Sequence, residues 1–324
     1  MFRFLFFVLI FWVNFKAFAQ ENPVQFTETT VSITCQDYNL HGTLTIPTQK
    51  TKKMKVALFI AGSGPTDRNG NNTAGLNSNA YQLFCRAMAE KGIATLRYDK
   101  LGSGESKPAN LKELVEKRDF ENEVADAVAW IEYLQKDKRF AEISLIAHSQ
   151  GTLVGILASQ RTGKTITKLV SLAGLGRRGS ETLKEQLGAQ PTFVSEAANP
   201  LIDSLANGYK VKNVPQYLEV LFKPSMQPYL ISWFKYDPAD ELAKLQIPAL
   251  IVQGTNDIQI KVEDAKYLAS KSKNATVVII EKMNHLLKIV EGDRSENLAS
   301  YNKPDLPIVP ELIEKVSAFL LKKK

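Results

Sequence analysis

The sequence predicts an α/β fold: a mostly parallel central sheet with helices on both faces and an inserted helical cap. Three observations lead to this prediction. The 324 residues are 44% hydrophobic and 23% charged, the composition of a folded globular protein. From residue 55 onward, short apolar runs alternate with amphipathic helical segments. One interval, from Gly176 to Tyr236, spans about sixty residues, which is too long for an ordinary crossover.

The first 19 residues have the features of a secretory signal peptide. Arg3 precedes an unbroken apolar run from Phe4 to Val13, and Ala17-Phe18-Ala19 supplies a cleavage site. This run is well short of the roughly 20 residues that a membrane-spanning helix needs. We therefore expect a mature domain over residues 20–324 that is secreted or periplasmic and has no stable membrane insertion.

Charge and cysteine content exclude several classes of protein. The formal charge of +7 falls to +5 once Arg3 and Lys16 are removed, and no basic cluster with groove-reading motifs is present, so nucleic-acid binding is not expected. The two cysteines, Cys35 and Cys85, do not make a disulfide scaffold. One bridge or two buried free thiols both remain open. The sequence indicates no oligomeric state.

The sheet is predicted to start antiparallel and to continue parallel. Val31–Cys35 and Gly42–Ile46 alternate in polarity around a turn at Asp37-Tyr38-Asn39, as half-buried strands do. The later runs are continuously apolar, as strands covered on both faces are. They are Val56–Ala61, Ile93–Tyr98, Ile143–Ala147, Lys168–Ala173, Ala249–Gln253 and Thr276–Ile280.

Apolar residues recur at helical spacing between these runs. They predict helices over Phe120–Leu134 and Leu312–Leu320, with their apolar faces on the sheet. The interval predicted as a cap, 176–236, has helical patches between prolines and is rich in aromatic residues. These aromatics either line an apolar pocket or only pack the cap onto the sheet, and both readings remain open. They are Tyr209, Tyr217, Phe222, Tyr229, Trp233 and Phe234.

Ser149 is the predicted nucleophile. A buried strand ends in the tight turn His148-Ser149-Gln150-Gly151, and a helix-compatible stretch follows it. This context matches a nucleophile elbow, a strained turn that needs small residues two before and two after the serine. Ala147 and Gly151 occupy those two positions. The alternative is that Ser149 is an ordinary helix N-cap.

His285 is the predicted base, because a serine hydroxyl needs a group that takes its proton. The chain has three histidines. His148 adjoins the serine, where neighbouring side chains diverge, and His41 lies far upstream. His285 follows the closing strand in a loop at the same carboxyl edge of the sheet, although it could also be a surface histidine.

Asp257 is the predicted partner of His285, orienting the imidazole. It follows the strand Ala249–Gln253 in Gly254-Thr255-Asn256-Asp257. Asp264 is the weaker rival, since it falls in the next helical stretch. Asp237 and Asp240 are instead expected to cap the helix that begins at Pro238.

The backbone amides of Ser63 and Gln150 are the predicted oxyanion hole. Acyl transfer needs two such donors, and Gln150 directly follows the nucleophile. The second donor should come from the glycine-rich loop Gly62–Gly70, where Ser63 is favoured and Gly64 is the alternative. Asp67, Asn69 and Asn71 resemble the start of a calcium loop, but its glycine and closing glutamate are missing. No metal or cofactor is therefore expected.

With these residues assigned, the sequence resembles the α/β-hydrolase superfamily, and within it a secreted esterase and serine-aminopeptidase-like group that carries a G-S-G-P-x-D-R motif. That motif is Gly62–Arg68 here. The likeness extends over nearly all of the mature chain: Arg97-Tyr98-Asp99-Lys100 with Gly102 and Gly104, the elbow, and Tyr236-Asp237-Pro238 leading into Pro248–Asp257. It implies hydrolysis of esters or, less often, amides by Ser, Asp and His. Ala61 replaces a histidine common in the group, and Ala147 replaces the first elbow glycine.

The predicted function is that of a secreted serine carboxylesterase acting on small or medium acyl esters. The main rival is an aminopeptidase or amidase, for which Glu181, Glu185 or Glu196 in the cap could bind a substrate amine. A thioesterase or acyltransferase is a further possibility. A non-catalytic binding module is the alternative from a different class, because a fold alone does not establish an activity.

Overall fold

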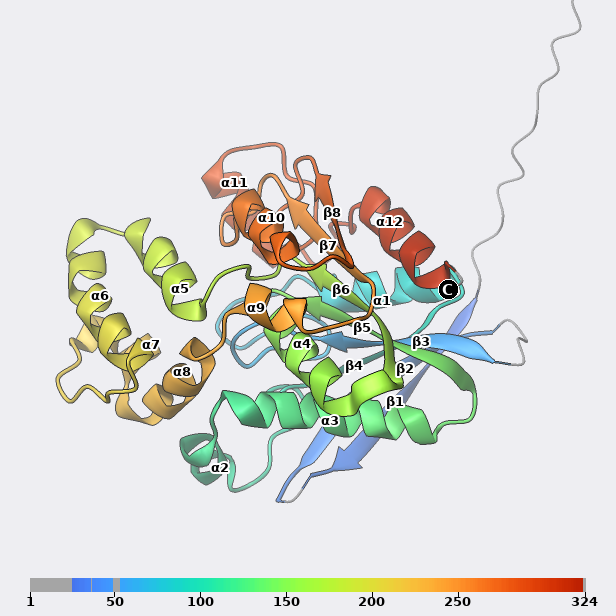
Figure 1. The fold of residues 1–324 in the computed structure, drawn as a ribbon, viewed down its shortest axis with the longest axis horizontal. Coiled ribbons are helices and arrows are strands. Elements are labelled where there is room, and N and C mark those ends of the chain that lie inside the picture. The colour runs from blue at the N-terminus through green and yellow to red at the C-terminus, as the bar shows by residue number, and fades with distance from the viewer. Residues whose placement is uncertain (1–24, 36, 49–52, 323–324) are drawn as a thin grey trace, which may run out of the picture.

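The central sheet has eight strands in the order β1-β2-β4-β3-β5-β6-β7-β8 (Figure 1). The computed structural model describes residues 25–35, 37–48 and 53–322, so the predicted signal peptide, residues 1–19, lies outside the described residues. The strands are β1 (Phe26–Thr34), β2 (Asn39–Pro47), β3 (Met54–Ile60), β4 (Ala94–Tyr98), β5 (Phe140–His148), β6 (Ile166–Leu172), β7 (Ala249–Gly254) and β8 (Ala275–Ile280). Each contains or overlaps one of the predicted runs.

The direction of the strands also follows the prediction. β1 pairs antiparallel with β2, and β2 pairs antiparallel with β4. All other pairs, from β4 and β3 through to β7 and β8, are parallel. Parallel neighbours bring their carboxyl ends to the same edge, so the loops after β3, β5, β7 and β8 meet there.

Helices connect the strands on both sides of the sheet. They are α1 (Ala80–Glu90), α2 (Leu111–Lys117), α3 (Phe120–Lys136), α4 (Gly151–Thr162), α5 (Gly179–Gly188), α6 (Thr192–Ala206), α7 (Glu219–Phe222), α8 (Gln227–Phe234), α9 (Pro238–Ala243), α10 (Val262–Ser270), α11 (Arg294–Ala299) and α12 (Pro310–Leu321). The predicted helices over 120–134 and 312–320 are confirmed as α3 and α12.

Strand β3 shows why its sequence is apolar without interruption. Val56, Leu58 and Ile60 face a core that includes residues of α3, α4, α9 and α10. Ala57 and Phe59 face a second core that contains residues of α1 and α12. Successive side chains of a strand point to opposite faces, so a strand covered on both sides buries all of them. The predicted α/β fold with helices on both faces is therefore confirmed.

Residues 176–236 form a separate helical group, seen at the left of Figure 1 as α5 to α8. This group has its own core, in which Phe222 and Phe234 are buried and Tyr229 and Trp233 are packed at its border. Tyr209 and Tyr217 are 71% and 53% exposed. Four of the six aromatics thus belong to the packed interior of the group, whereas Tyr209 and Tyr217 are largely exposed and Tyr217 packs edge-on against Phe193.

The two acidic residues at the start of α9 have different roles. Asp237 caps α9, because its carboxylate accepts from the amides of Ala239 and Asp240. Asp240 does not cap this helix; it lies in the first turn and pairs with Lys271. Cys35 and Cys85 are both free thiols, and Cys35 is only half-buried. No helix within the described ranges is long and apolar enough to span a bilayer.

Gly151 provides a test of the packing between α4 and β3. A Cβ atom at this position would lie 2.4 Å from the carbonyl oxygen of Ala61. We expect Gly151→Ala to lower the free energy of unfolding by about 1–3 kcal/mol or more, as overpacked substitutions do, measured by urea denaturation. Gly188→Ala is the control, since nothing lies within 4 Å of its added Cβ and alanine favours a helix. Equal stability of the two variants would contradict this account.

Candidate active site

Ser149 lies at the turn between β5 and α4. Its φ of 54° places it in the left-handed region, which non-glycine residues rarely adopt. Its amide donates to the carbonyl of Leu172 on the neighbouring strand β6, at 2.9 Å. The side of the turn is closed by Gly62, where an added Cβ would be 3.0 Å from the Cβ of Ser149. The backbone is therefore strained and tightly enclosed, as an elbow requires.

Asp257 and His285 are in direct contact. His285 Nδ1 lies 2.8 Å from Asp257 Oδ2, and both side chains are buried. Asp257 accepts three further hydrogen bonds. Gln253 Nε2 donates to Oδ2, and the amides of Gln259 and Ile260 donate to Oδ1. Because every acceptor position is used, the carboxylate has one orientation.

The charge of Asp257 is stabilised by these partners. Burial on its own raises the pKa of this carboxyl, but the attraction of His285 and the hydrogen bonds from His285, Ile260 and Gln259 lower the pKa below its ordinary value. An ionised Asp257 accepts from Nδ1 and leaves Nε2 of His285 as the nitrogen that can take a proton.

The loop that carries His285 is held by Asn284. Its side-chain oxygen accepts from the amides of Leu286 and Lys288, and its Nδ2 donates to Ser300. Lys288 is fully buried and donates from Nζ to the carbonyls of Ser78 and Lys303. These contacts fix a short loop in which Leu287 has a φ of 64°.

The structure does not join Ser149 to His285 directly. Ser149 Oγ makes no hydrogen bond with any described residue, although the two loops touch through His148. Hydrogen bonds of this kind are often long before a substrate binds.

The predicted oxyanion donors are free. Neither the amide of Ser63 nor that of Gln150 donates to any residue in the described ranges, and the same holds for the amide of Gly64. Ser63 follows Gly62, which packs on Ser149, and Gln150 directly follows the serine. Unpaired amides beside a strained serine can bind a developing negative charge.

His148 links three parts of this site. From the sequence it is excluded as the base, because its side chain should diverge from that of Ser149. Its Nε2 lies 2.8 Å from the carbonyl oxygen of His285, and its Nδ1 lies 2.9 Å from the hydroxyl of Tyr81. The Tyr81 oxygen also accepts from the amide of Gly62, at 3.2 Å. Because a carbonyl only accepts, Nε2 carries the proton, Nδ1 accepts, and Tyr81 donates.

His148 is held neutral. Burial, together with repulsion from His285, lowers its pKa from 6.5 to about 3. A neutral ring is what the hydrogen bonds require, since Nδ1 must accept. His148 is thus a bridge between the loops after β3 and β8, a role that no sequence pattern indicates.

The rival candidates lie in other contacts. Asp264 pairs with Arg177, which also pairs with Glu185, and Glu185 is further paired with Lys261. Glu181 and Glu196 are exposed. His41 lies in β2 beside the carboxyl end of β4, and two strands, β4 and β3, separate β2 from the strand β5 that leads to Ser149.

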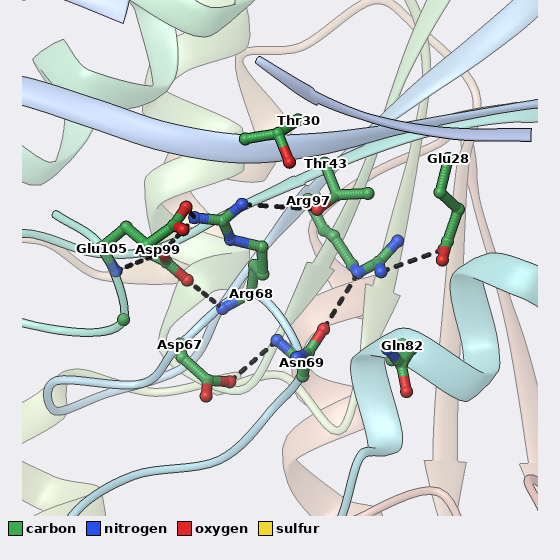
Figure 2. Close-up of a pocket in the computed structure, with 11 residues that line it drawn as sticks. Glu28, Thr30, Thr43, Asp67, Arg68, Asn69, Gln82, Arg97, Asp99 and Glu105 are labelled. Carbon is green, nitrogen blue, oxygen red and sulfur yellow. Dashed lines mark hydrogen bonds and ion pairs between the residues drawn. The ribbon is translucent and has the colours of Figure 1, made fainter. Parts of the chain in front are cut away.

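A polar cavity of about 410 Å³ lies beside the loop that follows β3 (Figure 2). Its walls include Arg68, which pairs with both Asp99 and Glu105, and Arg97, which pairs with Glu28. Asp67 also lines it and accepts from the amides of Asn69 and Asn71. The residues of this cavity do not include Ser149, Asp257 or His285. No group of three or more potential metal ligands occurs among the described residues.

Comparison with known proteins agrees with the fold. A family model described as serine aminopeptidase, S33, matches residues 74–224. Esterase EstD of Thermotoga maritima is 24% identical over 310 residues, which cover 93% of this chain and 69% of that protein.

Solved structures are similar over most of the chain. Est1E from Butyrivibrio proteoclasticus, with ferulic acid bound, has a TM-score of 0.59 at 19% identity, covering 90% of this chain and 100% of its own. Proline iminopeptidase of Mycobacterium smegmatis has a TM-score of 0.56 at 14% identity, covering 90% of this chain and 97% of its own. The chain has the α/β-hydrolase fold, and the proteins that it resembles are described as esterases and peptidases.

The neutral state of His148 can be tested by the pH dependence of stability. Below pH 6.5 an unfolded histidine binds a proton that the folded protein excludes until about pH 3, so stability must fall as the pH falls through this window. Between pH 7 and pH 5.5 we expect the protein to lose about 1 kcal/mol more than the His148→Asn variant, measured from urea midpoints. The same pH dependence in both proteins would show that His148 is protonated in the folded state.

Proposed function

We propose that this protein is a secreted or periplasmic serine carboxylesterase that cleaves small or medium acyl esters, with Ser149, His285 and Asp257 as its catalytic residues. The observation that supports it most is the buried contact between Asp257 and His285 on the loops that follow β7 and β8. Those loops share the carboxyl edge of the sheet with the strained Ser149. The EstD and Est1E similarities support an ester as the substrate.

The reaction follows from the position of each group. Ser149 Oγ attacks the ester carbonyl carbon while Nε2 of His285 takes the hydroxyl proton, and Asp257 stabilises the resulting imidazolium. The amides of Ser63 and Gln150 bind the oxyanion. His285 then gives its proton to the leaving alcohol as the carbon–oxygen bond breaks. Water, deprotonated by His285, releases the acid and restores Ser149.

Residues 176–236 complete the proposed enzyme as a cap over the site. Tyr229 of α8 lies 3.0 Å from the side chain of Gln150, so the helical group reaches the residue after the nucleophile. Cleavage of residues 1–19 and export are part of the same proposal, supported by the sequence pattern of that segment.

A peptidase of the same fold is the second candidate, because the matching family model is described as a serine aminopeptidase. Such an enzyme needs a carboxylate for the substrate amine. Glu185 is paired with Arg177 and Lys261, and Glu181 and Glu196 are exposed on the helical group. The contacts therefore favour an ester over an aminoacyl substrate.

Hydrolysis of p-nitrophenyl esters from acetyl to dodecanoyl tests the proposed function. We expect turnover at short or medium chain length, and a loss of at least about 10⁴-fold in Ser149→Ala, because the variant has no nucleophile. Aminoacyl anilides of matched size are assayed in parallel. Cleavage of anilides but not of esters would establish the peptidase, and full esterase activity in Ser149→Ala would reject the assignment.

A further inference from the structure

Lys100 is a buried cation beside the oxyanion loop that the mechanism above does not use. It follows strand β4, and the whole residue is only 9% exposed. Its Nζ donates to the carbonyl oxygen of Gly62 at 3.0 Å and pairs with Glu123 Oε1 at 2.8 Å. Lys100 thus links the loop after β4 to Gly62, in the loop after β3, and to helix α3.

The contact with Gly62 fixes the direction of the next amide. The carbonyl of Gly62 and the N–H of Ser63 belong to one peptide unit, and no cis peptide bond occurs in the described chain. In a trans peptide the C=O and the N–H point in opposite directions. Holding the carbonyl toward Lys100 therefore turns the Ser63 N–H to the other side. If the Gly62–Ser63 peptide were flipped, its carbonyl oxygen would take the place of the Ser63 N–H, and Lys100 Nζ would lose its acceptor.

The other side of Gly62 is tied as well. Its N–H donates to the hydroxyl of Tyr81, which in turn donates to His148. With both polar groups of Gly62 engaged, the peptide that contains the Ser63 amide has one orientation. The Ser63 N–H itself donates to no described residue.

We propose that Lys100 is a positioning residue for ester hydrolysis, which holds the Gly62–Ser63 peptide so that the Ser63 N–H faces the oxyanion. A cation on the carbonyl also polarises the peptide and strengthens its N–H as a donor. Lys100 touches neither substrate nor reacting atoms, so it acts only through this peptide. The inference rests on the proposed function, because it requires an oxyanion beside Ser149.

The neighbouring contacts explain why Lys100 is placed so accurately. Asp99 Oδ1 accepts from the amide of Arg68 at 2.7 Å, and Asp99 Oδ2 accepts from the Arg68 guanidinium at 2.6 Å and from the Glu105 amide at 2.9 Å (Figure 2). An added Cβ at Gly104 would lie 2.2 Å from Asp99 Oδ2. The loops after β3 and β4 are therefore fixed to each other beside Lys100.

Glu123 holds Lys100 from the opposite side and extends the chain of contacts to the proposed cap. Its Oε1 also accepts from the hydroxyl of Tyr229 at 3.1 Å, and that hydroxyl lies 3.0 Å from Gln150 Oε1. Gln150 supplies the second oxyanion amide. Tyr229 of helix α8 is thus linked to both proposed oxyanion donors. One link runs through Glu123 and Lys100 to the Gly62–Ser63 peptide, and the other runs through the side chain of Gln150.

The experiment compares Lys100→Met with the unmodified protein. The readouts are ester hydrolysis and the affinity of an alkyl boronic acid, which forms a tetrahedral adduct with the serine. We expect kcat to fall by about 100-fold or more with little change in KM, as loss of one oxyanion donor does, and boronate affinity to fall alongside it. Lys100→Arg keeps a charged donor and is expected to recover part of both. Lys112→Met, on the exposed surface of α2, is the control and should behave like the unmodified protein.

Each outcome decides the inference. Unchanged kcat in a folded Lys100→Met variant overturns it and leaves the esterase assignment intact. A fall in kcat with unchanged boronate affinity also overturns it, since a merely structural change would then be responsible. If Lys100→Met does not fold, Lys100→Gln is used instead, because it keeps a polar group without the charge. Its losses in kcat and in boronate affinity must be larger than those of Lys100→Arg and smaller than 100-fold. If the unmodified protein neither hydrolyses esters nor binds the boronate, the proposed function fails, and the inference fails with it.

Discussion

Strand β3 ends directly against the turn that carries Ser149, and the rest of the site depends on this contact. An atom added at Gly151 would strike the carbonyl of Ala61, and one added at Gly62 would press on Ser149. The strained φ of Ser149 persists because the sheet on one side and α4 on the other leave no room for another conformation. The same closeness brings the amide after Gly62 beside the serine. A looser turn would separate Ser149 from the amide of Ser63.

Two histidines next to each other have opposite tasks, and their surroundings separate them. His285 Nδ1 contacts Asp257, which stabilises the imidazolium in the proposed mechanism. His148 faces a carbonyl and a hydroxyl, is fully enclosed, and stays neutral. The neutral ring can therefore link the loop of His285 to the loop of Gly62, and in the proposed mechanism it does not compete for the proton of Ser149.

The strands were predictable because burial leaves a local record in the sequence. Val56 to Ala61 is apolar throughout since its residues face two cores, and β2 alternates since it lies near the edge of the sheet. Ser149, Asp257 and His285 could be selected because each follows such a strand at one edge of the sheet. His41 and His148 could be set aside from their positions in the sequence alone.

The supporting residues could not be selected in this way. His148 contacts Tyr81, 67 positions away, and His285, 137 positions away, and nothing in the local sequence records either pairing. Lys100 was part of a matched motif, but its role depends on which carbonyl its Nζ reaches. The expectation that Asp240 caps α9 was wrong because Asp237 already binds the free amides of that helix.

The central claim is that Ser149 and the amides of Ser63 and Gln150 converge on one tetrahedral centre. The most direct measurement is a crystal structure of the protein inactivated with an alkyl fluorophosphonate, whose phosphorus resembles that centre once bonded to serine. The account predicts phosphorus on Ser149 Oγ and the phosphoryl oxygen about 3 Å from both amide nitrogens. Phosphorus on another residue, or a phosphoryl oxygen turned away from Ser63 and Gln150, would contradict it.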